Sequence, residues 1–367
     1  MRVGLDYRTV GTSPQSGISR QVYAMEDALA SMPGIELERF TVAPLGDELR
    51  LRAHCPEWGC AKTAMHQPQH RLRFEAGFLP KALRDERIDL YISTFNMGLP
   101  LPPKPKGLRT ALLLHDLFQI TLNNYHANRL KALVYKTTDR LSIAWSVHSA
   151  DRVWTPSQYS ADETARLFPK ARDKIRVLPN QVDSFVGTAA DLSARQLPER
   201  YWLLVGTREL RKNVPFFVEA WQQARQQSPA VPELVLVGSL DHLPEAQRGY
   251  AGIRAVSGVS DAELQALYRQ ALRLWQPSYA EGFGLPVIEA LSVGTPVAVA
   301  SGTSLDEITP PSAPRFSPTD STGLVNLMLQ LGDRPAEQSP EQLRSWSERF
   351  NHQAYRRRLA ELIEELN

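Results

Sequence analysis

Two glutamates frame a glycine-rich turn late in the chain. Glu281 and Glu289 are separated by seven residues in the stretch YAEGFGLPVIEALSVGTP, and the loop EGFGL leads into a helix-period segment. Backbone N–H groups at a helix start attract anions, and glycine allows close backbone approach. The loop therefore offers free N–H groups to an anion, and Glu289 is placed to reach a ribose diol. The alternative is an ordinary capped helix with two surface carboxylates.

A basic loop precedes this turn in the sequence. The stretch VGTRELRKN follows an apolar strand and places Arg208, Arg211 and Lys212 just before a helix that begins near Val214. An arginine fork and a lysine ammonium beside helical N–H groups suit a diphosphate. The alternative is a solvated basic loop capped by Asn213.

Three further loops carry candidate residues. VSGVSDAELQALY offers backbone groups near Ser257 and Val259 to a nucleobase edge, or it is a plain capped helix start. GTSPQSGISRQVY lacks the spacing of a nicotinamide-binding loop, but Gly17 places an amide at a helix start. His115 ends an apolar strand and is followed by Asp116. Its imidazole is placed to polarise a substrate hydroxyl, and the alternative is a purely structural role.

The elements that must position these residues are strands alternating with helices. Continuously apolar runs such as RVGLDY, TALLLHD, YWLLVG and PVAVAS alternate with helix-period segments in two successive series. This order predicts parallel sheets covered on both faces. We predict a first domain over 1–185, a second over 186–349, and a final helix over 350–367 that packs back on the first. Ligands of such sheets bind at the carboxyl ends of strands, where nearly all the candidate residues fall.

Composition limits the possible partners. The 367 residues exceed one typical domain, and 42 basic against 40 acidic residues give a net charge of +2, which disfavours nucleic acid as a bulk partner. Cys55 and Cys60 provide no disulfide framework, and they form a zinc site only if His54, His66 or His70 joins them. No signal peptide or membrane-spanning run is visible, so we expect a cytoplasmic protein.

Taken together, the motifs resemble retaining glycosyltransferase family 4, which has the two-domain GT-B fold. The resemblance rests on PSYAEGFGLPVIEALSVGTPVAVA with its two glutamates, on VGTRELRKN, on LLLHD, on WTPSQYS and on VSDAELQALY. It is strong over about residues 200–310 and weaker over 1–180. It implies two doubly wound, Rossmann-like domains that face a central cleft. Thr207 stands where some relatives carry a basic residue.

The resemblance also implies roles for single residues. Arg211 and Lys212 would hold the donor diphosphate in a loop that starts at Gly206 and Thr207, Glu289 the ribose, and Ser257 and Val259 the base. Glu281 and the amides of Gly282, Phe283, Gly284 and Leu285 would hold the donor sugar. Gly17 would lie near the distal phosphate and His115 near the transferred sugar. The catalytic set is then His115, Glu281, Arg211 and Lys212.

The expected reaction is transfer of a hexose from a nucleotide diphosphate sugar with retention at the anomeric carbon. No carboxylate pair is set for double displacement, so positioning and stabilisation of the leaving diphosphate must dominate. No Asp-x-Asp occurs, which favours a metal-free site without cofactor. Alternatives are a pyridoxal-dependent phosphorylase, which lacks a compelling lysine, a sugar-nucleotide epimerase and a non-catalytic nucleotide-sugar-binding protein. GDP-mannose is favoured by analogy alone.

The acceptor is inferred from the first half of the chain. Basic residues gather at 70–109 and 129–136, with Phe74, Phe78 and Leu79 between them. These apolar side chains could enter an anionic membrane surface, or the region is a solvated face. Membrane contact would favour a lipid-diphosphate-linked glycan as acceptor, as in bacterial surface polysaccharide assembly.

Overall fold

The protein consists of two compact units, one of which is assembled from both ends of the chain. The computed structural model describes residues 1–13, 16–42, 44–45, 53–58, 68–122, 129–182, 189–334, 336 and 338–366, with the backbone only for 129–135. Unit 1 comprises Met1–Gln181 and His352–Asn367, and unit 2 comprises Val182–Asn351. The predicted boundary at 185/186 lies outside the described residues, as do Cys60 and His66.

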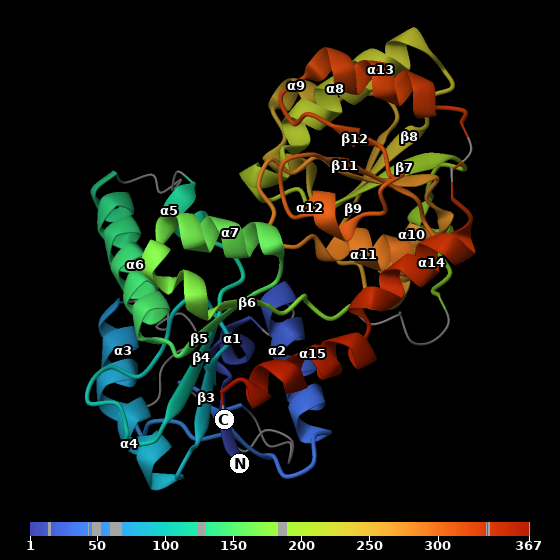
Figure 1. The fold of residues 1–367 in the computed structure, drawn as a ribbon. Coiled ribbons are helices and arrows are strands. Elements are labelled where there is room, and N and C mark those ends of the chain that lie inside the picture. The colour runs from blue at the N-terminus through green and yellow to red at the C-terminus, as the bar shows by residue number, and fades with distance from the viewer. Residues whose placement is uncertain are drawn as a thin grey trace. The chain divides into compact units, whose positions relative to one another are not determined.

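Unit 1 is built on a six-stranded parallel sheet of order β2-β1-β3-β4-β5-β6 (Figure 1). The four inner strands are mostly buried because helices cover them, whereas the two edge strands are partly exposed. They are β1 (Arg2–Asp6), β2 (Glu36–Phe40), β3 (Leu90–Ser93), β4 (Arg109–Leu113), β5 (Arg152–Thr155) and β6 (Ile175–Val177). The helices are α1 (Arg8–Thr12), α2 (Gly17–Ala30), α3 (Pro68–Arg73), α4 (Leu79–Asp85), α5 (Phe118–Thr121), α6 (Arg129–Ser149), α7 (Gln158–Leu167) and α15 (His352–Glu364).

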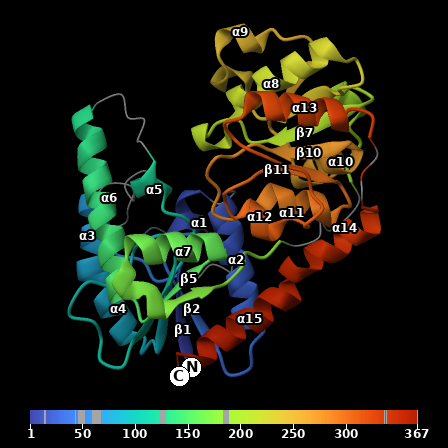
Figure 2. The same ribbon diagram turned by 45° about the horizontal axis from the view of Figure 1, so that its top comes forward.

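Helix α15 brings the C-terminal end of the chain into the core of unit 1. Its Tyr355, Leu359 and Leu362 belong to the same buried cluster as Val3 and Leu5 of β1. The helix lies beside α2 in both views (Figures 1 and 2). The terminal segment therefore contributes to this unit by apolar burial, at roughly 2 kcal/mol for each large side chain.

Unit 2 is built on a second six-stranded parallel sheet, of order β12-β11-β10-β7-β8-β9. Its strands are β7 (Tyr201–Val205), β8 (Glu233–Val237), β9 (Ile253–Val256), β10 (Arg273–Gln276), β11 (Val297–Ala300) and β12 (Arg315–Phe316). One buried cluster joins the sheet to α8 (Val214–Gln227) and α13 (Ser321–Leu331). The other joins it to α10 (Asp261–Gln270), α11 (Leu285–Ser292) and α14 (Pro340–Ser347). The short helices α9 (Glu245–Arg248) and α12 (Leu305–Ile308) complete the unit.

The strand order creates a switch point between β7 and β10. The chain runs from β7 outward to β8 and β9, and then returns to place β10 against the other side of β7. The chain leaves β7 toward β8 and leaves β10 toward β11. The loops after these two neighbouring strands therefore lead away from each other. Open α/β sheets bind their ligands at such points, beyond the carboxyl ends of the strands. Both of the longest motifs from the sequence lie here.

Two of the three apolar side chains proposed to enter a membrane are fully buried, so that interpretation is wrong for those two. Phe74 and Leu79 are fully buried in the core of unit 1, and Phe78 packs against it. The buried guanidinium of Arg8 lies 4.5 Å from the Phe74 ring centroid and forms a salt bridge with Asp6 at 2.7 Å. Among the described residues, no helix is long and apolar enough to cross a bilayer.

Candidate functional site

The loop after β7 is fixed by its threonine. Thr207 is buried, and its Oγ1 donates to the Ser239 carbonyl oxygen at 2.9 Å and accepts from the Ser239 N–H at 3.1 Å. Gly206 has φ of +87°, a conformation that glycine adopts without strain. The loop ends at Asn213, which adopts a left-handed conformation before α8 and donates from its amide to the Pro318 carbonyl oxygen at 2.9 Å. Thr207 thus ties the end of β7 to the end of β8.

The glycine-rich loop after β10 turns around a buried phenylalanine. Phe283 is 4% exposed, and its ring packs edge-on against Phe350 with centroids 5.5 Å apart. Its side chain therefore faces the core, so any contact that Phe283 makes with a donor is limited to its backbone. Gly284 has φ of +108°, and a Cβ there would lie 2.6 Å from Cδ2 of Leu305. The second glycine is thus required by both backbone conformation and space.

A serine from outside the motif holds this loop closed. The hydroxyl of Ser304 is buried and lies within hydrogen-bond distance of the carbonyl oxygens of Glu281 (2.8 Å) and Phe283 (3.0 Å). Sequence reasoning missed Ser304 because it lies beyond the motif, in a stretch of small polar residues.

The two motifs meet in one cluster of charges. Nη1 of Arg211 donates to Oε1 of Glu281 at 2.7 Å, and Nζ of Lys212 lies 3.3 Å from Oε2 of the same carboxylate. The Tyr279 N–H also donates to the Arg211 carbonyl oxygen at 3.0 Å, which joins the two loops. Residues that are about 70 positions apart in the sequence are therefore brought into direct contact at the switch point.

A glutamine that the sequence analysis did not select completes the cluster. Gln276, the last residue of β10, is 1% exposed, and its Nε2 donates to Oε2 of Glu281 at 3.1 Å and to Oγ of Ser278 at 2.9 Å. Its signal in the sequence is a polar residue at the carboxyl end of an otherwise apolar strand. Gln276 holds Glu281 in place without contributing charge.

Burial and neighbouring charges act in opposite directions on Glu281. Burial alone raises the pKa of this carboxyl, but the Lys212 ammonium and the Arg211 guanidinium outweigh it and lower the pKa to about 2. Glu281 is therefore ionised at neutral pH. It neutralises one of the two buried cations, and Glu209, whose side chain is 57% exposed, pairs with Nε of Arg211 at 2.6 Å from the rim. A diphosphate would have to draw Arg211 away from these carboxylates.

Glu289 occupies a separate place one turn into α11. It is 9% exposed, and Oε2 accepts a hydrogen bond from the Tyr268 hydroxyl of α10 at 2.8 Å. The two glutamates of the motif thus have different partners, because Glu281 binds the cations and Glu289 binds a phenol. They do not form an acid–base pair.

The turn after β9 is the most exposed part of the predicted site. Arg195 donates from Nη1 to the Ser257 carbonyl oxygen at 3.2 Å, and Val259 is half-buried against the core. Ser260 and Glu263 form a capping box that starts α10. The order β7-β8-β9 places this turn at the same sheet edge as the charge cluster, about 10 Å away by two strand spacings.

In unit 1 the structure fixes the tautomer of His115. The residue is 7% exposed. Its backbone N–H donates to Oδ1 of Asn96 at 2.8 Å, and the ring atom Nε2 lies 2.8 Å from the Thr94 carbonyl oxygen. Only a protonated Nε2 satisfies that carbonyl, which leaves Nδ1 as an acceptor. Burial lowers the pKa of His115 despite the contact with Thr94, so the ring is neutral at pH 7. Gly17 is exposed at the first position of α2.

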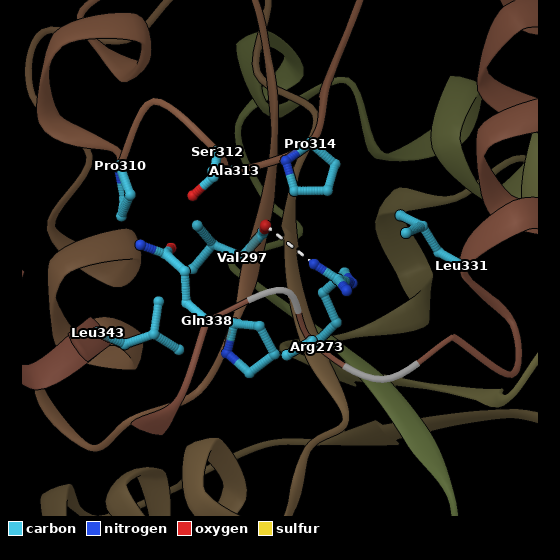
Figure 3. A pocket seen from close by; sticks show the side chains of 11 residues that line it. Arg273, Val297, Pro310, Ser312, Ala313, Pro314, Leu331, Gln338 and Leu343 are labelled. Carbon is cyan, nitrogen blue, oxygen red and sulfur yellow. Dashed lines mark hydrogen bonds between the residues drawn. The ribbon is translucent and has the colours of Figure 1, made fainter. Parts of the chain in front are cut away.

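Two cavities lie apart from these residues. One of about 20 Å³ lies near the amino ends of β10 and β11, where Arg273 points toward Val297, and it holds no more than about one water (Figure 3). The other, a groove of about 640 Å³ in unit 1, lies between residues 32–35 and α15. Neither cavity is lined by Arg211, Lys212 or Glu281, whose side chains pair with one another.

Only one group in the described part of the chain has metal-ligand character. Glu38, His54 and Glu86 lie together in unit 1, but Arg2 already bridges both carboxylates, with 2.7 Å to Glu38 and 3.5 Å to Glu86. None of the three belongs to the predicted site. That the reaction needs no metal stays a prediction.

Comparisons with known proteins assign a family to each unit. Residues 15–184 match the model of Glycosyltransferase Family 4, and residues 199–333 match that of Glycosyl transferases group 1. The O-antigen chain mannosyltransferase B of Escherichia coli is 30% identical over 236 residues, which cover 60% of this chain and 61% of that protein. The O-antigen chain mannosyltransferase RfbU of Salmonella typhimurium is 26% identical over 210 residues, 56% of this chain and 57% of that protein. The matched regions thus span about three fifths of these relatives.

A solved structure supports the fold across the whole chain. Sucrose-phosphate synthase from Thermosynechococcus elongatus superposes with a TM-score of 0.76 at 18% identity, covering 100% of this chain and 99% of that one. At this identity the likeness shows the fold alone. The two family models show that the chain carries a Glycosyltransferase Family 4 domain over residues 15–184 and a Glycosyl transferases group 1 domain over residues 199–333, and the structural likeness shows the GT-B fold.

Proposed function

We propose that the protein transfers a hexose from a nucleotide diphosphate sugar to a glycan or lipid-linked glycan during bacterial surface polysaccharide synthesis. GDP-mannose is the favoured donor and mannose the favoured transferred sugar, because both O-antigen relatives carry the name mannosyltransferase. The observation that carries the proposal is the cluster of Arg211, Lys212 and Glu281 at the switch point between β7 and β10. The two matched family models support the same reaction class.

The proposed chemistry is departure of a nucleoside diphosphate with retention at the anomeric carbon. Arg211 and Lys212, whose side chains are 16% and 10% exposed, stabilise the negative charge that develops on the leaving diphosphate. The low exposure strengthens this interaction because little water screens it. The amides of the loop from Gly282 to Leu285 and the carboxylate of Glu281 orient the donor sugar. The residues of the chain supply this stabilisation without a metal.

His115 acts as an acceptor in this proposal. With Nε2 committed to the Thr94 carbonyl oxygen, its neutral ring offers Nδ1 to a hydroxyl of the transferred sugar. The N–H of His115 is held by Asn96, so the backbone that carries the ring is fixed. Gly17 keeps its proposed place near the distal phosphate, where the amides of α2 begin.

Contact with an anionic membrane remains part of the proposal, with different residues from those first expected. In the described part of unit 1, the exposed large apolar side chains are Leu72 of α3 and Leu141 and Trp145 of α6, at 57%, 66% and 41%. Exposed Arg73 and Arg140 neighbour them in the sequence. We expect cosedimentation with vesicles that contain phosphatidylglycerol but not with pure phosphatidylcholine, and loss of binding in Leu141→Ser/Trp145→Ser. Equal binding by that variant would remove this surface from the proposal.

The decisive experiment is direct. Purified protein is titrated with GDP, UDP, ADP and dTDP by calorimetry, and the matching sugar nucleotides are then incubated with and without a lipid-linked glycan acceptor. Transfer that requires acceptor supports the proposal. Conversion of the donor without acceptor would indicate an epimerase, and binding without turnover a non-catalytic protein. Failure to bind any nucleoside diphosphate overturns the proposal.

A further inference from the structure

The carboxylate of Glu289 is held by a phenol from the neighbouring helix. The Tyr268 hydroxyl donates to Oε2 of Glu289 at 2.8 Å, between α10 and α11. Tyr268 is fully buried, and Glu289 is 9% exposed. The main chain of Tyr268 is fixed in turn, because Oγ1 of Thr295 donates to its carbonyl oxygen at 2.7 Å. The phenol is therefore rigid, and it sets the direction of the carboxylate.

Packing alone does not require this hydroxyl. A phenylalanine would fill the same space, whereas a buried carboxylate needs hydrogen-bond donors to stay ionised in one orientation. Tyr201 provides the contrast within the same buried cluster. Its hydroxyl donates to the Leu267 carbonyl oxygen at 2.9 Å, a contact with the main chain alone. Of these two hydroxyls, that of Tyr268 contacts a side chain of the proposed site and that of Tyr201 does not.

We propose that Tyr268 is a positioning residue that orients Glu289 toward the ribose hydroxyls of the donor nucleotide. The inference rests on the proposed function, in which the Glu289 carboxylate binds the ribose hydroxyls. With one carboxylate oxygen bound by the phenol, the carboxylate is held in a single rotamer before the nucleotide arrives. Preorganisation of this kind lowers the entropic cost of the ribose contact. Tyr268 thereby sets how strongly the protein selects a ribonucleotide over its 2′-deoxy analogue.

The test compares ribose selectivity in Tyr268→Phe with that of the wild type. Dissociation constants are measured by calorimetry for GDP and 2′-deoxy-GDP, and for the UDP and ADP pairs in the same way. In the wild type we expect the ribonucleotide to bind roughly tenfold tighter or more, because a hydrogen bond to a charged group is lost in the deoxy analogue. In Tyr268→Phe the ratio should fall to about threefold or less. Tyr201→Phe is the matched control and should keep the wild-type ratio.

The outcomes separate this inference from the proposed function. If the wild type binds no nucleoside diphosphate, the proposed function fails. If the wild type selects ribose and Tyr268→Phe retains the full ratio while losing only thermal stability, Tyr268 is structural and the inference is overturned. A wild type that binds both analogues equally also overturns it, since Glu289 then recognises no 2′-hydroxyl. Glu289→Gln should match Tyr268→Phe in its loss of selectivity.

Discussion

Replacing Lys212 by methionine removes one of the two buried cations while keeping most of the side-chain volume. The ammonium makes a single contact of 3.3 Å with Glu281, which keeps Arg211 at 2.7 Å and Gln276 at 3.1 Å. The carboxylate is therefore not stranded, and we expect the unfolding free energy to change by no more than about 1–2 kcal/mol. A lost charge-assisted contact to the diphosphate should cost about 1.5–3 kcal/mol, or roughly 10- to 150-fold in affinity. The loss in kcat should be larger, about 3–4 kcal/mol, because the charge develops in the transition state.

Calorimetric titration with GDP, single-turnover kinetics and urea unfolding on the same protein would check these three magnitudes. Lys174→Met is the matched control, because Lys174 is partly buried and its ammonium donates to the carbonyl oxygens of His148 and Ala150 in unit 1, outside the proposed site. It should leave nucleotide affinity unchanged. If Lys212→Met lost stability and turnover in equal measure, or kept wild-type affinity for every nucleoside diphosphate, the assignment of Lys212 to the diphosphate would be refuted.

Three further predictions follow from the same loops. The pKa of Glu281 is depressed from 4.5 to about 2 in the folded protein. Its contribution to the unfolding free energy, at most about 3 kcal/mol, is therefore present above pH 4.5 and is lost as the pH falls toward 2. In urea unfolding, Glu281→Gln should lose less stability than the wild type over this pH range. Gly284→Ala should lower the unfolding free energy by about 2 kcal/mol or more through positive φ and contact with Leu305, whereas Gly258→Ala, with φ of +61° and open space, should cost about 1 kcal/mol in the same assay. Ser304→Ala should cost about 1–2 kcal/mol and raise KM for the donor more than it lowers kcat, which steady-state kinetics would show; unchanged KM would mean that Ser304 serves stability alone.

The sequence was a reliable guide to the elements and to the ends of strands where the motifs fall. Alternation of apolar runs with helix-period segments identified most strands within one or two residues, because buried parallel strands leave a continuous apolar signal. The segments at 158–167 and 302–347 were not predicted from the sequence, and they form α7, α12, β12, α13 and α14. The segment of two residues at β12 is too short to carry a periodic signal.

The aromatic residues near position 74 show where residue type misled. Their spacing among basic residues suggested a membrane-facing surface, but the π-helical turn Phe74–Phe78 directs Phe74 into the core. Phe283 is a different case, since only its backbone amide was expected to contact the donor, and the packing of its ring on Phe350 leaves that expectation a prediction. Neither outcome follows from local pattern, because burial depends on which distant residues surround a side chain.

By itself, the sequence determined which residue types are available: two cations before α8, two carboxylates around a glycine-rich turn, and no run able to span a membrane. It also determined that these residues follow strands, since apolar patterning is local. Only the tertiary structure decided that β7 and β10 are neighbours, so that Arg211 and Lys212 meet Glu281, and that Tyr268 reaches Glu289. Strand order depends on how whole helices cover a sheet, and it is therefore set by the packing of the complete unit, which no short stretch of sequence encodes.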